Sequence, residues 1–355
     1  MKVIFRLLSL CICFILFFFI GSCKQGQKIK TINMKEIRKG DELHLLFYNV
    51  ENLFDTLDDP FTEDDDFTPH ERKKWTNERY EEKLNNLSKV IAQAANGFPA
   101  FVGLAEVENR TVLEDLINTP ALREAGYGIV HEDSPDVRGI DVAFLYQKEL
   151  FSVNDYKAIS IQFDFDPSIT TRDILYINGT FSNGEELHFF VNHWPSRREG
   201  QLETEPKRIT VAKRLREEID LIFEKRSESK VILMGDFNDY PYNKSIVDVL
   251  RATAQWPQPE GGFYNLVAEK EEIGDGTHNY RGDWGFLDQM MVSPALITSE
   301  GLTTDLDSVK VVKEEWMLFY HTRYREYKPN KSYVGDNYVG GYSDHLPLVM
   351  RLSIR

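Results

Sequence analysis

The sequence predicts an α/β fold, and two kinds of pattern carry this prediction. Short apolar segments rich in β-branched and aromatic residues recur from residue 43 onward, and most are bounded by Gly, Asn, Asp or Pro, as strands are. Two longer segments, 78–95 and 209–223, instead space their apolar residues as an amphipathic helix does. No repeat and no linker interrupts residues 41–355, so we expect one domain with a mixed sheet system there.

Eight segments are expected to form strands because each is short, apolar and rich in β-branched or aromatic residues. In chain order they are LHLLFYNV (43–50), FVGLAEV (101–107), DVAFLY (141–146), DILYING (173–179), ELHFFVNHW (186–194), KVILMGDF (230–237), LDQMMVS (287–293) and HLPLVMRL (345–352). The helix over 78–95 follows the first strand, with apolar residues at Tyr80, Leu84, Leu87 and Ile91. The helix over 209–223 precedes the sixth strand, with apolar residues at Ile209, Ala212, Leu215, Ile219 and Phe223.

Composition limits the class of protein. The chain has 355 residues, of which 42% are hydrophobic and 12% aromatic, so it can bury a large core and does not resemble a disordered or fibrous chain. Its formal net charge is -15, which argues against a protein that holds nucleic acid mainly through a broad basic face. A basic patch confined to a cleft remains compatible with this charge.

The first 22 residues have the pattern of a signal peptide. Lys2 and Arg6 give a positive start, residues 7–20 are apolar, and Gly21 and Ser22 are the small residues expected at a cleavage site. The segment "IGSC" resembles the bacterial lipobox, which predicts cleavage before Cys23 and acylation of that cysteine. The alternative is an ordinary secretory peptide with an incidental cysteine.

The cysteines agree with this interpretation, because Cys11, Cys13 and Cys23 all lie in the N-terminal segment and the mature domain can have no internal disulfide. Residues 23–40 are predicted to be the lipidated cysteine and a polar tether, and residues 41–355 the folded domain. We therefore expect the protein in the cell envelope, anchored to a membrane by its N-terminal lipid on the periplasmic or cell-surface face.

Polar side chains collect where the expected strands end or begin. Rigid strands with exposed loops at their ends are where α/β proteins assemble ligand sites. A single such motif is more often a turn whose side chains bond their own backbone. Six separate segments nevertheless share the feature, and they supply Asn49, Glu51, Glu106, Asn192, His193, Asp236, Asn238, Asp288, Ser343, Asp344 and His345.

Carboxylates and amides without cysteine predict an oxygen-rich site for a hard divalent cation such as Mg²⁺, with Mn²⁺ or Ca²⁺ as alternatives. Zinc is less suitable because the histidines do not cluster in the sequence.

The ordered motifs "FYNVEN", "AEVEN", "VNHWPS", "GDFND", "LDQMMVS" and "SDHLPLV" resemble the endonuclease/exonuclease/phosphatase superfamily over about residues 43–353. "NVENLFDT" and "GDWGFLDQMMVS" resemble most the secreted bacterial nuclease-like proteins of that superfamily. The resemblance implies a DNase I-like four-layer sandwich, in which two mixed β-sheets pack face to face and helices cover their outer sides.

The resemblance also implies the metal ligands. Glu106 is expected to be the main ligand, with Glu51 and Asn49 beside it and Asp344 near the metal. Position 51 is Glu where many relatives have Asp or another residue, so the sequence departs from the pattern of the superfamily there.

Five further roles follow from the resemblance. Asp236 and Asn238 would hold and activate the nucleophilic water and contact the phosphate. His345 would contact the scissile phosphoryl oxygen and be oriented by Asp288, although Asp288 has Arg281 as an alternative partner. His193 would act on the leaving group.

Basic and aromatic residues near the motifs are candidates for substrate binding. Arg172, Arg197 and Arg198 are expected to guide the phosphate, and surface charge is the alternative. Further candidates, with the same alternatives or a place in the core, are Arg138, Lys207, Arg208, Trp194, Trp284 and Tyr342.

The sequence therefore predicts a metal-dependent phosphodiester hydrolase, an envelope-anchored nuclease in the first instance. Its expected partners are nucleic acid or another phosphodiester and the membrane that holds the anchor, with no obligate protein partner. A phosphomonoesterase or a phospholipid-headgroup phosphodiesterase is the alternative within the superfamily. The sequence shows no clear apolar hairpin that would dock on lipid, and no motif is missing that would favour a non-catalytic binding lipoprotein.

Overall fold

The computed structural model describes residues 34–323 and 325–355. The predicted signal peptide, Cys23 and most of the predicted tether lie outside the described residues. Among the residues that are described, no helix combines the length and the apolar character that crossing a bilayer requires.

Two seven-stranded mixed sheets form the centre of the fold, which confirms the predicted architecture. Sheet I has the order β14-β20-β1-β2-β4-β3, with β15 also paired to β20. Its strands are β1 (Glu42–Leu53), β2 (Phe101–Val107), β3 (Tyr127–His131), β4 (Asp141–Gln147), β14 (Leu302–Thr303), β15 (Val309–Val311) and β20 (Leu348–Ile354).

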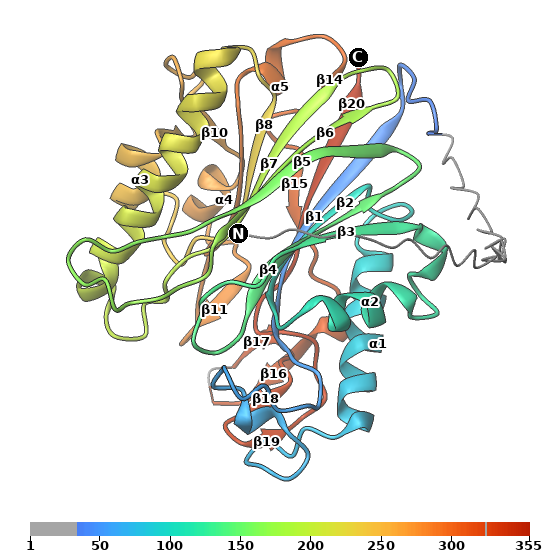
Figure 1. The fold of residues 1–355 in the computed structure, drawn as a ribbon, viewed down its shortest axis with the longest axis vertical. Helices are drawn as coiled ribbons and strands as arrows, with labels where there is room; N and C mark the ends of the chain where they lie inside the picture. The colour runs from blue at the N-terminus through green and yellow to red at the C-terminus, as the bar shows by residue number, and fades with distance from the viewer. Residues whose placement is uncertain (1–33, 324) are drawn as a thin grey trace, which may run out of the picture. The chain divides into compact units, whose positions relative to one another are not determined.

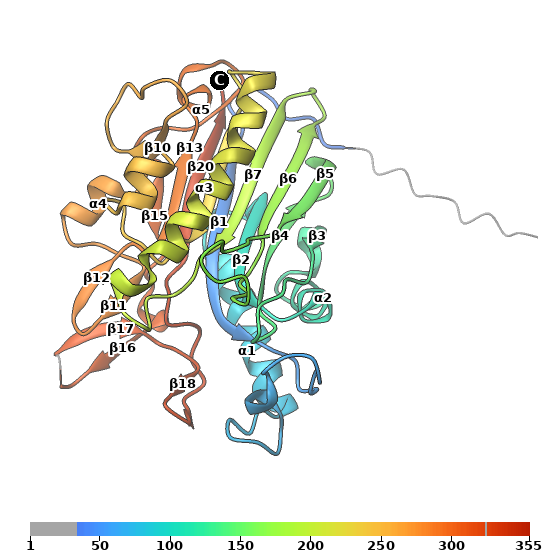
Figure 2. The ribbon, with the colours of Figure 1, turned by 60° about the vertical axis from the view of Figure 1, so that its left-hand side comes forward.

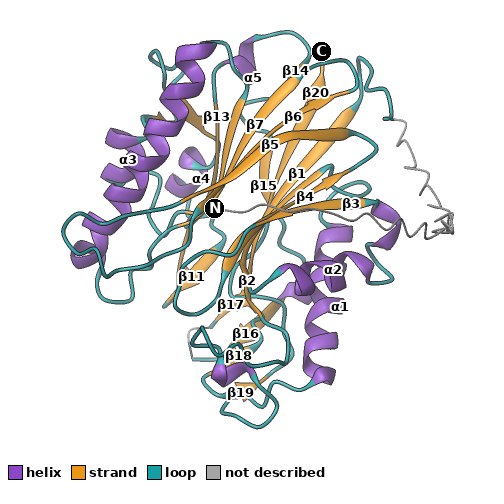
Figure 3. Cartoon of the chain, viewed as in Figure 1, coloured by secondary structure: helices purple, strands orange, loops and turns teal. Residues whose placement is uncertain are grey.

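Sheet II has the order β5-β6-β7-β8-β13-β10-β9. Its strands are β5 (Phe151–Ile159), β6 (Ile174–Phe181), β7 (Glu186–His193), β8 (Val231–Asp236), β9 (Ala252–Thr253), β10 (Phe263–Asn265) and β13 (Asp288–Val292). Three two-stranded hairpins complete the strand set, and they are β11 (His278–Tyr280) with β12 (Asp283–Gly285), β16 (Leu318–His321) with β17 (Glu326–Pro329), and β18 (Tyr333–Val334) with β19 (Asn337–Tyr338). Figure 3 shows these strands against the helices and loops.

Helices cover the outer faces of the two sheets (Figure 1). The helices are α1 (Asn77–Gln93), α2 (Arg110–Asn118), α3 (Gln201–Lys225), α4 (Ala268–Glu272) and α5 (Ala295–Thr298). α1 and α2 pack on sheet I and bury their apolar residues with its outer face, whereas α3 packs on sheet II (Figure 2). The layers are therefore helix, sheet, sheet, helix.

The main core lies between the two sheets, where aromatic and aliphatic side chains from both inner faces meet. Phe101 and Phe144 of sheet I contact Phe189 of sheet II, with ring centroids 4.9 and 4.8 Å apart. Gly103 lets the Met234 side chain of the opposite sheet pack against the β2 backbone, because a Cβ atom at position 103 would lie 2.7 Å from the Met234 sulfur.

All eight expected strands are present, as β1, β2, β4, β6, β7, β8, β13 and β20. α1 buries Tyr80, Leu84, Leu87 and Ile91 as predicted. α3 begins at Gln201, eight residues before the predicted start. The prediction missed these first turns because they are polar, contain Pro206 and lack an apolar period.

Strand direction gathers the polar ends of the strands at one end of the sheets. β1 runs parallel to β2 with Asn49 opposite Ala105, and β7 runs parallel to β8 with His193 opposite Asp236. β13 is antiparallel to β8, so its first residue, Asp288, lies opposite Asp236. β20 is antiparallel to β1, so the segment that precedes it also arrives at this end.

Candidate active site

A cavity of about 1170 Å³ lies at this end of the sheets. Its lining includes twelve of the residues that the sequence singled out, which are Glu51, Glu106, Arg138, Arg172, His193, Arg197, Arg198, Lys207, Asp236, Asn238, Asp344 and His345. Asn49 and Asp288 lie behind this lining and bond to residues that form it. The six motifs are therefore brought together in space.

Asp236 is held in the wall of the cavity by two hydrogen bonds. The Asn49 amide nitrogen donates to its Oδ2 at 3.0 Å, and the Asn238 backbone N–H donates to its Oδ1 at 2.9 Å. Burial raises the pKa of Asp236 to about 6, and the negative charge of Asp288 adds to this, although His345 acts in the opposite direction. A carboxylate with such a pKa is suited to accept a proton from water near neutral pH.

His345 and Asp288 form a buried ion pair. The imidazole Nδ1 lies 2.7 Å from Asp288 Oδ2, and Thr277 Oγ1 donates to the same oxygen. Burial would lower the pKa of His345, but the charge and hydrogen bond of Asp288 raise it well above its usual value. His345 is therefore a cation at neutral pH, with its Nε2 directed to the cavity and 3.9 Å from Asp236 Oδ2. The sequence offered His345 and Arg281 as partners of Asp288, and in the structure Asp288 pairs with His345.

His193 differs from His345 in charge, because its pKa is lowered where that of His345 is raised. Burial, followed by the charges of Arg172 and Arg138, holds the pKa of this histidine well below its usual value, so the ring is neutral. Its Nε2 lies 3.7 Å from Asp236 Oδ2 and 3.8 Å from Glu106 Oε1. The buried Nδ1 has no hydrogen-bond partner, which favours the tautomer with the proton on Nε2.

The carboxylates lie where the backbone is strained. Glu51, Asn52 and Glu106 have φ angles of 52°, 55° and 65°. These values lie in the left-handed region, which residues other than glycine seldom adopt. This turn aims the Asn52 N–H at Glu106 Oε2, at 2.9 Å. Such residues cost about 1–3 kcal/mol each and concentrate at functional sites.

Glu51 is buried and Asp344 is half-buried, and the two carboxylates act on each other's charge. Burial, followed by the charge of Asp344, raises the pKa of Glu51 to about 8, and Lys83 partly offsets this rise. Burial also acts to raise the pKa of Asp344, but His345 and His278 lower it below the usual value. Carboxylates that share a buried wall and repel one another fit a divalent cation, so Glu51, Glu106 and Asp344 suit the predicted metal.

Asn49 links the two halves of the site. Its amide oxygen accepts the Glu51 N–H at 3.1 Å, while its amide nitrogen orients Asp236. Asn49 is almost completely buried, so its clearest contribution is to hold those two carboxylates in register.

The predicted basic residues differ in what they can reach. The Arg172 guanidinium is buried and bonds to Asp136 and to the backbone oxygens of His193 and Trp194, so it holds the wall of the cavity. Arg197 lines the cavity and lies over the Tyr240 ring, 4.3 Å from its centroid, and Arg198 also lines it. Arg208, by contrast, is fully buried against Asp239, at 2.7 Å.

The aromatic candidates also divide. Trp194 is fully buried in the core under α3, where its ring contacts Phe237 and its Nε1 donates to Asn192. It cannot stack on a ligand in this position. Trp284 and Tyr342 are partly buried and pack beside the core between sheet I and α1.

Sequence reasoning missed His278 and Lys83. His278 lines the cavity from β11, with its ring centroid 4.9 Å from that of His345. β11 has only three residues, too few for a periodic signal. Lys83 lies on the buried face of α1, where a lysine contradicts the amphipathic pattern, and that contradiction was the available signal.

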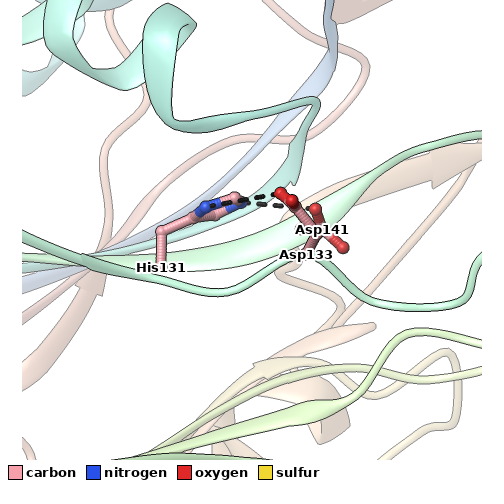
Figure 4. Close-up of side chains that lie close together, drawn as sticks. All are labelled: His131, Asp133 and Asp141. Carbon is pink, nitrogen blue, oxygen red and sulfur yellow. Dashed lines mark ion pairs between the residues drawn. The ribbon is translucent and has the colours of Figure 1, made fainter. Parts of the chain in front are cut away.

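A second acidic cluster lies on the loop that carries Arg138. The His131 ring nitrogens face Asp141 at 3.3 Å and Asp133 at 3.9 Å (Figure 4). Asp141 also accepts the Ser134 N–H at 2.8 Å. The bonds from Ser134 to Asp141 hold the first part of this loop to the start of β4, and the loop leads to Arg138 in the cavity lining.

Two packed mixed sheets with carboxylates and a His–Asp pair at their ends define a phosphoesterase of the DNase I-like class. The chain matches the Endonuclease/Exonuclease/phosphatase family over residues 44–354 and belongs to it. Members of this family are phosphoesterases and generally depend on a divalent metal. No curated protein sequence matches the chain.

Solved structures share the fold at low sequence identity. An endonuclease/exonuclease/phosphatase family protein from Bacteroides thetaiotaomicron has a TM-score of 0.57 at 16% identity, covering 89% of this chain and 96% of that chain. TDP2 of D. rerio, complexed with single strand DNA product, has 0.53 at 16%, covering 88% and 99%. The human nocturnin catalytic domain with bound sulfate anion has 0.52 at 15%, covering 88% and 95%.

Proposed function

We propose that this protein is a divalent-metal-dependent phosphodiesterase and that nucleic acid is its substrate. The observation that carries the reaction class is one cavity in which Glu106, Asp236 and the cationic His345 face one another. A phosphodiester is an anion that repels hydroxide, so its hydrolysis needs positive charge at the phosphate and a positioned base for water. The cavity provides places for both.

A divalent cation would be held by Glu51, Glu106 and Asp344 and would stabilise the charge that develops on the phosphoryl oxygens. Asp236 accepts a proton from the attacking water, and its two fixed hydrogen bonds set the direction of that proton. The His345 Nε2–H donates to a phosphoryl oxygen while Asp288 fixes the ring.

His193 serves the leaving group in this scheme. Its neutral ring has an Nε2–H that can donate a hydrogen bond to the leaving oxygen as the P–O bond breaks. The leaving oxygen then takes its proton from solvent, because a neutral imidazole is too weak an acid to supply it.

Exposed aromatic rings beside the cavity favour a substrate that carries a base. Tyr240 lines the cavity and stacks on Tyr242, with centroids 5.5 Å apart and planes 24° apart. Tyr242 is 64% exposed, so its ring remains available for stacking. Arg197 lies over Tyr240, which places a cation beside the stack. Single-stranded nucleic acid is bound by this combination of aromatic faces and nearby positive charge.

The test of reaction class is turnover of methyl p-nitrophenyl phosphate by the full mature chain, with and without EDTA. We expect turnover that EDTA abolishes and Mg²⁺ or Mn²⁺ restores. Turnover of p-nitrophenyl phosphate or inositol phosphates in place of methyl p-nitrophenyl phosphate would instead support the monoesterase alternative. Turnover of sphingomyelin vesicles in place of oligonucleotides would support the lipid phosphodiesterase alternative.

The test of substrate class is a comparison of two esters. Thymidine 5′-(p-nitrophenyl phosphate) carries a base and methyl p-nitrophenyl phosphate does not. Tyr242→Ala should raise KM about tenfold for the thymidine ester alone, since stacking on one aromatic ring contributes roughly 1–3 kcal/mol per base. Tyr156→Ala, at another exposed tyrosine on strand β5, is the control and should change neither KM. Equal effects on both esters would refute base stacking.

The envelope location also belongs to this proposal. It depends on the signal-peptide and lipobox patterns that end at Cys23. Cys23→Ala should release the protein from the membrane fraction and abolish labelling by radioactive palmitate, whereas Cys11→Ala should leave both unchanged. Membrane retention of the Cys23→Ala variant would show that lipid is not the anchor.

A further inference from the structure

Lys83 is a buried charge that the proposed mechanism does not use. It lies on α1 between the buried residues Tyr80 and Leu87, and the whole residue is 1% exposed. An ammonium group in such a place is costly unless other groups compensate for its lost hydration. The position therefore requires an explanation.

Two hydrogen bonds satisfy part of the ammonium group. Its Nζ donates to Ser332 Oγ at 2.7 Å and to the Tyr342 backbone oxygen at 2.6 Å. Ser332 in turn donates its backbone N–H to Glu51 Oε2 at 2.8 Å. Lys83 thus reaches a proposed metal ligand through a single intervening residue.

The negative charges that act on Lys83 are those of the proposed metal site. Among the residues that the structure describes, no carboxylate is recorded within 4.0 Å of its Nζ. Burial lowers the pKa of Lys83 to about 8, and the carboxylates that oppose this and favour its charge are Glu51, then Asp344, then Glu106. Within the described part of the chain, Lys83 therefore contacts no acidic side chain and instead offsets three carboxylates that line the cavity.

We propose that Lys83 is a built-in counter-cation of the metal site, which weakens the affinity of the site for divalent cations and limits it to one ion. When a bound cation holds all three carboxylates in their ionised form, their charge and that of Lys83 sum to two negative charges, which a single divalent cation neutralises. This inference rests on the proposed metal-dependent function and goes beyond it, because it assigns an electrostatic role to a residue outside the cavity lining.

Electrostatics and packing predict opposite results when the ammonium is removed. If Lys83 acts through its charge, its loss leaves three carboxylates without compensation, and the metal should bind more tightly. If Lys83 only holds Ser332 and Tyr342 in place, its loss should loosen Glu51, and the metal should bind more weakly. The sign of the change therefore separates the two roles.

The experiment is titration of the full mature chain with Mn²⁺ by isothermal calorimetry. Lys83→Gln keeps an N–H donor without the charge, and Lys83→Arg keeps the charge. We expect one Mn²⁺ per wild-type chain, a Kd at least about tenfold lower for Lys83→Gln, and little change for Lys83→Arg. Lys89→Gln is the matched control on the same helix, where the ammonium lies over the Trp316 ring, and it should bind as the wild type does.

Salt provides a second readout. Surface charges are screened within about 8–10 Å at moderate ionic strength, whereas a buried charge is screened much less. The tighter binding by Lys83→Gln should therefore persist in 0.5 M NaCl. If Lys83→Gln does not fold, Lys83→Met, which fills similar volume without charge, replaces it.

The Mn²⁺ titrations distinguish failure of the counter-cation role from failure of the metal site. Weaker or unchanged Mn²⁺ binding by both uncharged variants, or two ions bound to the wild type, would overturn the counter-cation role while leaving the metal-dependent function intact. Absence of Mn²⁺ binding to the wild-type chain would refute the metal site itself, and the inference with it.

Discussion

The Asp288–His345 pair allows a prediction on pH dependence. Turnover in the proposed mechanism needs Asp236 ionised and His345 protonated, so the pH–rate profile should be a bell. Its acidic limb should lie near pH 6, the pKa to which burial raises Asp236. Its alkaline limb should lie well above 6.5, because Asp288 raises the pKa of His345.

Asp288→Asn removes the charge and keeps an oxygen that can accept the hydrogen bond from His345 Nδ1. The pair is buried, and the bond is 2.7 Å long. Loss of one partner of a buried pair costs about 3–5 kcal/mol, and one pKa unit corresponds to about 1.4 kcal/mol. We therefore expect the alkaline limb to move down by at least about two pH units, while the acidic limb moves down slightly.

The assay is kcat/KM for methyl p-nitrophenyl phosphate from pH 5 to 10 at saturating Mg²⁺. Protein stability gives an independent check, because the pKa of His345 is raised in the folded state. Its contribution to stability is fully present below pH 6.5 and is lost as the pH rises through the raised value. Asp288→Asn should therefore lose stability mainly at low and neutral pH. An alkaline limb that stays in place would refute the assignment of a cationic His345 to turnover.

Four further outcomes are expected. Asp236→Asn should lower kcat at least about 10²-fold because an amide cannot accept the proton from water, and it should lower the midpoint of urea unfolding only slightly because one of the two acceptor oxygens remains. Glu106→Gln should raise the Mg²⁺ concentration for half-maximal turnover at least about tenfold, and an unchanged requirement would exclude Glu106 as a ligand. Replacing both Arg197 and Arg198 with Ala should raise KM for an oligonucleotide but not for methyl p-nitrophenyl phosphate, and equal loss on both would place these arginines in the chemistry or the fold. Leu87→Ala should lower the free energy of unfolding by about 2–5 kcal/mol in urea without changing KM, because Leu87 is on the fully buried face of α1 and does not line the cavity.

The sequence predicted the central strands because burial on both faces gives them continuous apolar runs. β5 was missed because it lies at the edge of sheet II and has mostly exposed residues, such as those of its NDYK segment, so it carries no apolar pattern. The stacking of two sheets followed from the family resemblance, since local periodicity does not report which faces meet.

The candidate site was predictable to the extent that strand ends mark it. Asp236 and His345 each follow or precede a strong strand signal, and the structure places both in the cavity. The side-chain partners were not predictable. Arg172, for example, stabilises the wall of the cavity through hydrogen bonds to the backbone oxygens of His193 and Trp194, which are distant in sequence. Lys83 meets Ser332 across 249 residues of sequence, a separation that no local pattern encodes.

The hydrogen bonds at Ser343 connect the segment before β20 to β1. Ser343 Oγ donates to the Asn49 backbone oxygen at 2.7 Å, and it accepts the His345 N–H at 3.0 Å. β20, which follows, lies inside sheet I between β14 and β1. A chain clipped before Ser343 would therefore lose a central strand of sheet I together with the hydroxyl that bonds to Asn49 and His345. We expect removal of residues 343–355 to disrupt the sheet and the candidate site together.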